Sequence, residues 1–188
     1  MSSLLESTAN TRVVLPGSFR YLRSDAPTTP TERDIAFLLE HGVTTLIDLR
    51  SMEEVQRRPC PLAEDGRFDY RHMPVTGGSA LPSSVADVPC SYLRMVDAQM
   101  ERILRAITGA GSNVMYFCSA GKDRTGVVSA LLQRQAGMSR ADIAADYALS
   151  GENLQAMFTV FLREHPDVNV EICTPKPAYM EAFLDMLE

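Results

Sequence analysis

Short apolar runs alternate with amphipathic segments along the first part of the chain. Residues 43–49 and 113–117 form runs of mainly apolar side chains, and residues 68–73 form a short, more polar run. Runs of this length favour strands, and the most apolar ones favour strands buried on both faces. Because helical patterns lie between them, we expect an α/β domain with a central, mostly parallel sheet flanked by helices, followed by a helical C-terminal part.

The helical segments show apolar residues three and four positions apart. One helix is predicted after Thr31 and a short one after Ser51, which has Glu54 three positions later as in a capping box. The aliphatic positions between residues 93 and 107 predict one long helix whose stripe belongs to the core. The remaining expectations are helices over residues 139–150, 154–163 and 177–187, and a long loop over residues 74–89.

Composition narrows the class of protein. The chain has 188 residues, 45% of them hydrophobic, which suits a single domain over residues 1–188 with a sizeable core. The net charge of −6 argues against binding nucleic acid or an anionic membrane through the overall field. No apolar stretch approaches membrane-spanning length, and no basic start precedes a long apolar run. We therefore expect a cytoplasmic protein without stable membrane insertion.

The cysteines and histidines suggest neither a metal site nor a disulfide framework. Cys60, Cys90, Cys118 and Cys173 are widely separated and form no C-x-x-C pair, and the chain has three histidines. We expect no metal and no cofactor. A cysteine after an apolar strand is usually a buried core thiol, which is the expectation for all of these residues except Cys118.

The stretch from Cys118 to Arg124 places charged residues between a predicted strand and a predicted helix. In that context its seven residues, CSAGKDR, form a turn whose backbone N–H groups converge on one point. A nest of amides at a helix N-terminus attracts anions, and ligands of parallel sheets bind beyond the carboxyl ends of the strands. The same field favours a thiolate nucleophile at Cys118, and the planar guanidinium of Arg124 suits two oxygens of one phosphate. The loop therefore predicts phosphate chemistry.

The chain also carries a C-x5-R-T sequence that resembles the signature of cysteine-dependent protein tyrosine phosphatases. More narrowly, CSAGKDRTG resembles the bacterial family of tyrosine and phosphoinositide phosphatases whose loop reads C-x-x-G-K-D-R-T-G. Further similar segments are NTR at 10–12, LRSDAP at 22–27, VTTLIDLRSMEEV at 43–55 and ADYALSGEN at 145–153. The resemblance covers most of the chain. It implies a tyrosine-phosphatase-like fold and a metal-independent phosphomonoester hydrolase acting on phosphotyrosine, with phosphoserine, phosphothreonine and phosphoinositides as further substrates.

The resemblance implies a role for each residue of the loop. Cys118 attacks phosphorus to form a cysteinyl-phosphate, and Thr125 hydrogen-bonds the sulfur as it leaves. Arg124 and the loop amides stabilise the equatorial oxygens. Asp123 is the implied general acid or base, and Lys122 adds positive charge at the rim of the pocket. The implied substrate-binding residues are Ser119, Ala120, Gly121, Lys122, Asp123 and Arg124.

Other types of phosphate loop fit less well. A Walker-type nucleotide loop is out of register, because Tyr116 stands at its first glycine and Asp123 follows the Gly-Lys pair. A rhodanese-like sulfurtransferase is not expected to combine this spacing with KDRTG. A catalytically weak or inactive phosphate-binding pseudophosphatase stays open as the alternative. Phe117 stands where the family usually has His, and residues 76–78 offer no carboxylate where some relatives have an acid.

Charged residues outside the loop have weaker assignments. Asp48 and Arg50 lie at the end of a predicted strand, where we expect a structural ion pair that supports the loop. Arg12, Arg23 and Arg50 are candidate cations for further substrate phosphates, and Asp87 and Asp97 are reserve candidates for the acid. The partner implied by the resemblance is a phosphorylated protein or a phosphoinositide, and the sequence does not indicate an oligomeric state.

Overall fold

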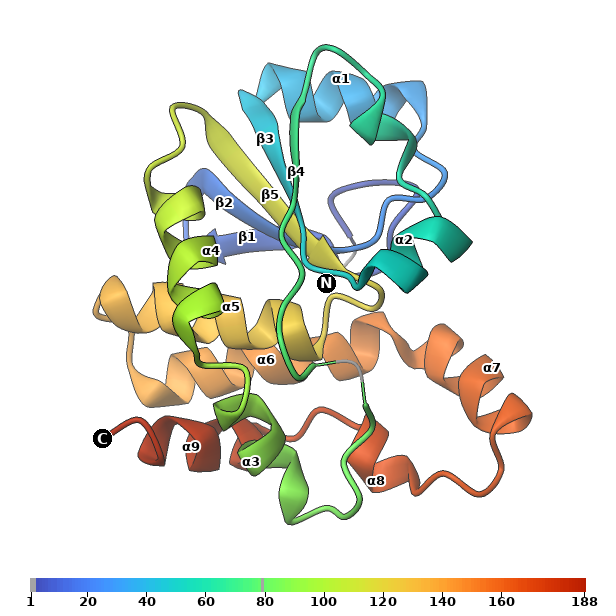
Figure 1. Ribbon diagram of the computed structural model, residues 1–188, viewed down its shortest axis with the longest axis vertical. Coiled ribbons are helices and arrows are strands. Elements are labelled where there is room, and N and C mark those ends of the chain that lie inside the picture. The colour runs from blue at the N-terminus through green and yellow to red at the C-terminus, as the bar shows by residue number, and fades with distance from the viewer. Residues whose placement is uncertain (1–2, 79) are drawn as a thin grey trace.

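A mostly parallel sheet forms the centre of the structure, a computed structural model that describes residues 3–78 and 80–188 (Figure 1). Over these residues five strands form one sheet in the order β1-β2-β5-β3-β4. The strands β2 (Ser18–Asp25), β5 (Asn113–Cys118), β3 (Val43–Asp48) and β4 (Asp69–His72) pair in parallel. At the edge, β1 (Arg12–Leu15) runs antiparallel to β2. The predicted fold class is confirmed.

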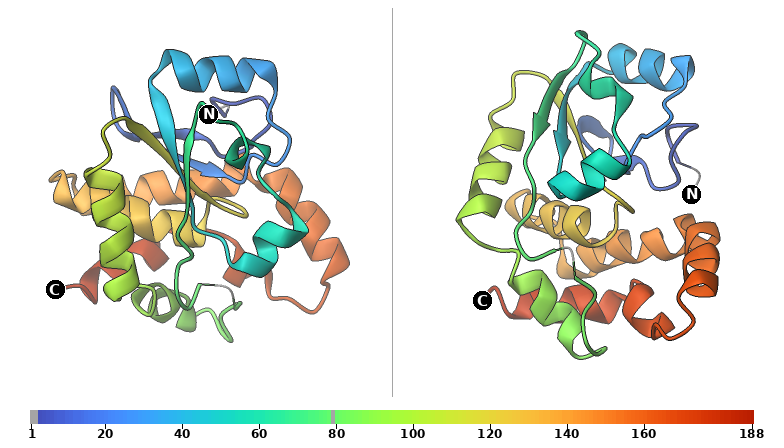
Figure 2. Two further views of the ribbon diagram at one scale, coloured as in Figure 1. Left: turned by 45° about the horizontal axis from the view of Figure 1, so that its top comes forward. Right: turned by 45° about the vertical axis from the view of Figure 1, so that its right-hand side comes forward.

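Helices cover both faces of this sheet. Along β5, Val114, Tyr116 and Cys118 belong to one core, whereas Met115 and Phe117 belong to the other. This follows from the two-residue period of a strand, and burial on both faces explains the uninterrupted apolar run. The first face carries α4 (Ala98–Thr108), α5 (Asp123–Gln135), α6 (Arg140–Asn153) and α9 (Pro177–Asp185). The second carries α1 (Glu32–Glu40) and the 3-10 helix η1 (Pro61–Ala63), and the right-hand view of Figure 2 shows α1 and α4 on opposite sides of the strands.

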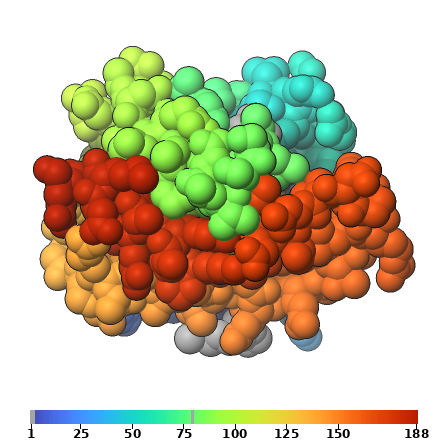
Figure 3. All heavy atoms as spheres, turned by 90° about the horizontal axis from the view of Figure 1, so that it is seen from below, coloured from blue at the N-terminus to red at the C-terminus, as the bar shows by residue number. Residues whose placement is uncertain are grey.

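The remaining helices gather near the end of β5. They are α2 (Met52–Arg57), α3 (Asp87–Leu93), α7 (Gln155–Glu164) and α8 (Val170–Cys173). Seen from below in Figure 3, the green α3 region lies beside the orange and red segments of α8 and α9, and α3 contacts α9. Segments far apart in the sequence therefore enclose the same edge of the sheet.

The carboxyl ends of the parallel strands meet at that edge. The register pairs Asp25 of β2 with Cys118 of β5, and it pairs Asp48 of β3 with Phe117 of β5 and with His72 of β4. The loop that follows Cys118 thus emerges from the middle of the sheet, between the loops that follow β2 and β3. This is where open parallel sheets bind their ligands.

The single long helix expected over residues 93–107 is wrong, because the structure has two helices there. Asp97 has an extended backbone and its carboxylate accepts the N–H of Met100 at 2.9 Å, so a new helix, α4, begins after it. Leu93 and Val96 are each 37% exposed, and the buried stripe starts at Met100. The α3 helix also occupies the last part of the segment expected to be a loop.

Strands β1 and β2 and the short α8 have no counterpart among the predicted elements. The two strands turn at Gly17, which has a φ of 73°. In β2 the apolar Leu22 is followed by Arg23, Ser24 and Asp25, all buried. A strand that buries consecutive polar residues shows neither alternation nor an apolar run, so periodicity does not identify it.

Asp34 attaches the N-terminal segment to α1. Its carboxylate accepts the N–H groups of Thr31, Glu6 and Ser7, and the Thr31 hydroxyl accepts the N–H of Asp34 in return. Burial acts to raise the pKa of Asp34, but these hydrogen bonds outweigh it and hold the pKa below its ordinary value. The ionised carboxylate is therefore a stabilising element of the fold.

We expect Asp34→Ala to lower the free energy of unfolding by about 1–2 kcal/mol at pH 7, because helix capping and chain attachment are both lost. A carboxylate with a lowered folded-state pKa contributes stability above its unfolded pKa of about 3.9 and loses it as the pH falls. The difference from wild type in urea unfolding should therefore shrink below about pH 4. The control is Asp142→Ala, at the same position of α6, where the carboxylate accepts, within the described ranges, only from the Ser139 hydroxyl. Equal losses in both variants would contradict this role of Asp34.

Candidate active site

The loop from Cys118 to Arg124 joins β5 to α5. Cys118 is the last residue of β5 and is 3% exposed, and Arg124 lies in the first turn of α5. Gly121 has a φ of 65°, and a Cβ at this position would come within 2.5 Å of the backbone of β2. The loop can turn back against the end of β2 because this residue is glycine.

Buried donors behind the loop hold its carbonyl oxygens. The Nδ2 of Asn10 donates to the carbonyls of Ala120 at 3.3 Å and of Gly121 at 3.0 Å, and Nη2 of Arg23 donates to Gly121 at 2.9 Å. Within residues 3–78 and 80–188, the N–H groups of residues 119–124 have no protein acceptor. The amides are thus left as a concave nest at the N-terminus of α5, the arrangement that binds anions.

One partly buried carboxylate forms ion pairs with both arginines behind the loop. Asp146 of α6 accepts from Nε of Arg12 and from Nη1 of Arg23, each at 2.7 Å. Burial acts to raise the pKa of Asp146, but the charges of Arg23 and Arg12 hold it below its ordinary value. Arg12 also donates to Oδ1 of Asn10 at 2.5 Å. Arg12 and Arg23 therefore support the loop from behind, and the expectation that they offer charge to substrate is wrong.

Glu54 of α2 fixes the guanidinium of Arg124. Its oxygens accept from Nη1 at 2.5 Å and from Nη2 at 2.6 Å, and Oε1 also accepts from the Ser119 hydroxyl at 2.6 Å. Burial acts to lower the pKa of Arg124, but the hydrogen bonds that Arg124 donates to Glu54 raise it. The same hydrogen bonds hold the pKa of Glu54 far below its ordinary value. Since Glu54 takes the Nη1–Nη2 edge, Nε and the second proton of Nη2 remain for an anion.

The second role of Glu54 is the one that the sequence predicts. Its Oε2 accepts the N–H of Ser51 at 2.8 Å and completes the capping box of α2. Sequence reasoning found this cap but missed the bond to Arg124. The available signal was the position of Glu54 within the family-like segment VTTLIDLRSMEEV.

Lys122 lies in the wall of the site. It is 5% exposed, and its Nζ donates to the carbonyl of Cys173 at 2.6 Å, lies 3.4 Å from Oδ2 of Asp123 and lies 5.4 Å from the ring centre of Phe158. The ammonium group of Lys122 therefore contacts both the loop, through Asp123, and α8, through Cys173. The side chain of Asp123 is 38% exposed, and its Oδ1 accepts from the Tyr92 hydroxyl at 2.6 Å.

Thr125 is fully buried beneath the loop. In the part of the chain that the structure describes, its Oγ1 makes no hydrogen bond, so the expected bond to the Cys118 sulfur is not formed here. The help that Thr125 gives to the leaving sulfur stays a prediction.

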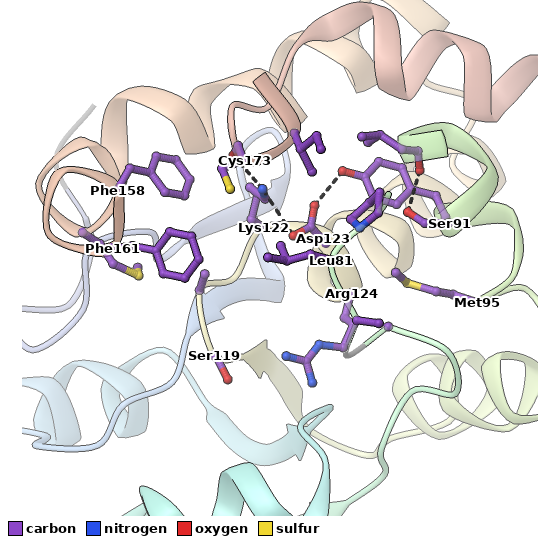
Figure 4. Close-up of a pocket in the computed structure, with 18 of the residues that line it drawn as sticks. Leu81, Ser91, Met95, Ser119, Lys122, Asp123, Arg124, Phe158, Phe161 and Cys173 are labelled. Carbon is purple, nitrogen blue, oxygen red and sulfur yellow. Dashed lines mark hydrogen bonds and ion pairs between the residues drawn. The ribbon is translucent and has the colours of Figure 1, made fainter. Parts of the chain in front are cut away.

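A cavity of about 380 Å³ lies over the loop (Figure 4). Its polar part comes from Ser119, Lys122, Asp123 and Arg124 together with Glu54, and Figure 4 shows Phe158 and Phe161 to one side and Met95 to the other. Further apolar lining comes from Leu81, Val88, Met157 and Ile172. A phosphate on the loop would therefore have an apolar space beside it.

Of the carboxylates that line this cavity, Asp123 is the one that is not bound to Arg124 and can serve as the candidate acid. The lining carboxylates are Asp123 and Glu54, and Glu54 is bound to that arginine. The reserve candidates lie elsewhere: Asp97 caps α4, and Asp87 lies 3.5 Å from Arg94. At the expected acid position Gly78 packs so closely on Arg124 that a Cβ would lie 2.5 Å from its Cγ.

Asp48 and Arg50 form the buried ion pair that the sequence predicts. Nη2 of Arg50 lies 2.6 Å from Oδ2 of Asp48, which also accepts from the Tyr70 hydroxyl at 2.8 Å. The guanidinium carbon lies 5.6 Å from the ring centre of Phe117, so the residue that replaces the usual His is part of this packing. Arg50 is thus paired with a carboxylate, and it does not line the cavity over the loop.

Comparison with known proteins decides the family. A model of the tyrosine phosphatase family matches residues 7–188. The chain belongs to the tyrosine phosphatase family.

Two relatives and one solved structure give the range of similarity. The chain is 32% identical over 135 residues to a tyrosine-protein phosphatase of Nostoc commune, covering 66% of this chain and 46% of that protein. It is 32% identical over 171 residues to the triple specificity protein phosphatase PtpB of Mycobacterium tuberculosis, covering 72% of this chain and 62% of that protein. The chain thus spans less than two thirds of the length of either relative. The human tyrosine phosphatase-like serine/threonine/tyrosine-interacting protein is 16% identical, with a TM-score of 0.47 over 81% of this chain and 97% of that one.

Neither a metal-binding cluster nor a membrane-spanning helix occurs in the described ranges. There, His, Cys, Asp and Glu side chains form no group of three or more suited to hold a metal ion. The same ranges contain no helix that combines the length and the apolar character needed to cross a bilayer.

We expect Asp146→Ala to lower the free energy of unfolding by about 3–5 kcal/mol, because it leaves Arg12 and Arg23 buried without a counter-charge. The matched control is Asp185→Ala, which removes an exposed ion pair with Arg140 and should cost about 1 kcal/mol or less. Urea unfolding measures both. Similar losses of stability in the two variants would contradict the role of Asp146 in holding Arg12 and Arg23 behind the loop.

Proposed function

We propose that residues 1–188 act as one phosphatase domain that hydrolyses phosphomonoesters through a cysteinyl-phosphate on Cys118. The observation that carries the proposal is the loop itself: carbonyls bound from behind, amides without a protein acceptor, and Cys118 and Arg124 at its two ends. An oxyanion held by such fixed dipoles is stabilised without reorganisation during the reaction. The cytoplasmic location stays a prediction.

The proposed reaction has two halves. In the first, the Cys118 thiolate attacks phosphorus in line, the bond to the leaving oxygen breaks, and Asp123 gives that oxygen its proton. The amides and Arg124 stabilise the non-bridging oxygens. In the second, Asp123 takes a proton from water, which attacks phosphorus and breaks the P–S bond. Inorganic phosphate leaves, and Thr125 donates to the departing sulfur.

The walls of the cavity support an aromatic leaving group as the preferred substrate. Phe158, Phe161 and Met95 line the space beside the loop, and a phenyl ring placed there would bury apolar surface. Phosphotyrosine is the proposed physiological group.

Phosphoinositides are the less favoured substrates. Of the cations expected to bind their additional phosphates, Lys122 lines the cavity, whereas Arg12, Arg23 and Arg50 are paired with carboxylates in the interior. The name of the relative PtpB, triple specificity protein phosphatase, supports including phosphoserine and phosphothreonine substrates in the test.

Cys118→Ser should abolish phosphate release from an aryl phosphate yet keep binding of vanadate or phosphate, because the nest stays and the nucleophile is lost. Cys90→Ser, at a half-buried cysteine of α3, is the matched control and should keep wild-type turnover. Wild-type activity should persist in the presence of a chelator. Binding without turnover by wild type would instead favour the pseudophosphatase, and rescue of a chelated, inactive enzyme by magnesium would reject the cysteinyl-phosphate mechanism.

Phe161→Ala should lower kcat/KM for a phosphotyrosine peptide by about tenfold, because the phenyl ring of the substrate loses an apolar wall. Val160→Ala is the control on the same helix, since Val160 is exposed and does not line the cavity. A panel of phosphotyrosine, phosphoserine and short-chain phosphoinositide substrates measures the preference. If Lys122→Ala left every phosphoinositide rate unchanged, the proposed contact of Lys122 with those substrates would be rejected.

A further inference from the structure

Two buried tyrosines from different helices meet behind Asp123. The hydroxyl of Tyr92, on α3, donates to Oδ1 of Asp123 at 2.6 Å and lies 2.5 Å from the hydroxyl of Tyr147, on α6. Figure 4 shows the bond from Asp123 toward this side and Lys122 on the other side of its carboxylate. Both rings are nearly inaccessible to solvent, so three polar groups form one continuous chain leading to the cavity.

The hydrogen bonds in this chain run in one direction while Asp123 is ionised and only accepts. Burial raises the pKa of Tyr92 and of Tyr147 well above the ordinary value, so both are neutral phenols near pH 7. The single hydroxyl proton of Tyr92 lies in the bond to Asp123. Tyr147 must therefore donate its own proton to the oxygen of Tyr92.

The surrounding residues hold both rings in place. The Tyr92 ring packs edge-on against those of Tyr147 and Phe183, with centres 5.9 Å and 6.1 Å apart. Tyr147 also lies over Gly126, where a Cβ would come within 3.1 Å of its ring. The last glycine of the KDRTG sequence thus makes room for Tyr147, and the chain of hydroxyls is built into the packing around α5.

We propose that Tyr92, backed by Tyr147, is a positioning residue that holds Oδ1 of Asp123 so that the transferable proton resides on Oδ2. The inference rests on the proposed function, in which Asp123 is the general acid. As long as the Tyr92 hydroxyl donates to Oδ1, a hydrogen on that oxygen would face the hydroxyl proton, so a protonated Asp123 carries its hydrogen on Oδ2. The charged and titratable groups facing this carboxylate are Lys122, at 3.4 Å from Oδ2, with Arg124 and Cys173 nearby.

The bond from Tyr92 becomes stronger during the reaction. When the Oδ2–H bond breaks and the proton passes to the leaving oxygen, negative charge develops on the Asp123 carboxylate. A hydrogen bond to a charged acceptor is roughly twice as strong as one to a neutral acceptor. The Tyr92 hydroxyl therefore stabilises the transition state more than the ground state, which is the condition for raising kcat.

Leaving-group dependence is the test. Tyr92→Phe should lower kcat for phenyl phosphate by about tenfold or more, but kcat for dinitrophenyl phosphate by less than about threefold, because an acidic leaving group needs little protonation. Asp123→Asn should show the same selectivity with a larger loss, and adding Tyr92→Phe to it should bring no further selective loss. The control is Tyr116→Phe, which removes another buried hydroxyl, bonded to Ser129 at 2.7 Å, and should leave the ratio of the two rates unchanged.

The outcomes separate this inference from the proposed function. If Asp123→Asn is selective and Tyr92→Phe is not, the positioning role is overturned while the phosphatase mechanism stands. A uniform loss in Asp123→Asn removes Asp123 as the acid and the role of Tyr92 with it, whereas absence of turnover in wild type rejects the proposed function itself. Tyr147→Phe keeps the test decisive if Tyr92→Phe fails to fold: it leaves the Tyr92 hydroxyl in place and should give a smaller loss of the same selective kind.

Discussion

The hydrogen bonds that Asn10 and Arg23 donate to the loop carbonyls determine which way its amides face. Without them the carbonyl dipoles of residues 120 and 121 would be free to turn toward the bound anion and repel it. Asn10 comes from the segment before β1, Arg23 from β2, and Asp146, the ion-pair partner of Arg23, from α6. The phosphate nest is therefore not a local property of seven residues. It depends on three distant parts of the chain packing together around a buried charge.

The elements predicted from the sequence are those whose cause is local. The apolar runs of β3 and β5 are buried by layers on both faces, and the caps at Thr31 and Ser51 act within a single turn. The division between α3 and α4 was missed, because one residue, Asp97, overrides a helical pattern that continues through it. Strands β1 and β2 were missed for a different reason: their polar residues are buried by partners on α6 and the loop, about a hundred positions away or more.

In the candidate site, too, the residues of one local motif were predicted from the sequence, and those that depend on contacts between distant helices were not. Cys118, Arg124 and Asp123 stand together in one short motif, and in the structure Asp123 and Arg124 line the cavity while Cys118 ends β5 at the start of the loop. Glu54, Tyr92 and Tyr147 were missed because their contacts with the motif join different helices. The opposite error concerns Arg12, Arg23 and Arg50: a sequence reveals that a residue is cationic but not that it is already ion-paired with a carboxylate.

The hydrogen bond from Lys122 to the carbonyl of Cys173 limits the width of the ligand that the cavity can accommodate. It ties the phosphate loop to α8, and Ile172 and Cys173 of that helix belong to the cavity lining. A bulky branched ligand would have to push α8 outward and break a charged hydrogen bond in a largely apolar setting, whereas a flat ring would not. Inhibitor design should accordingly begin from planar phosphate mimics, and a compound that widens the cavity should lose affinity in proportion to the contact that it breaks.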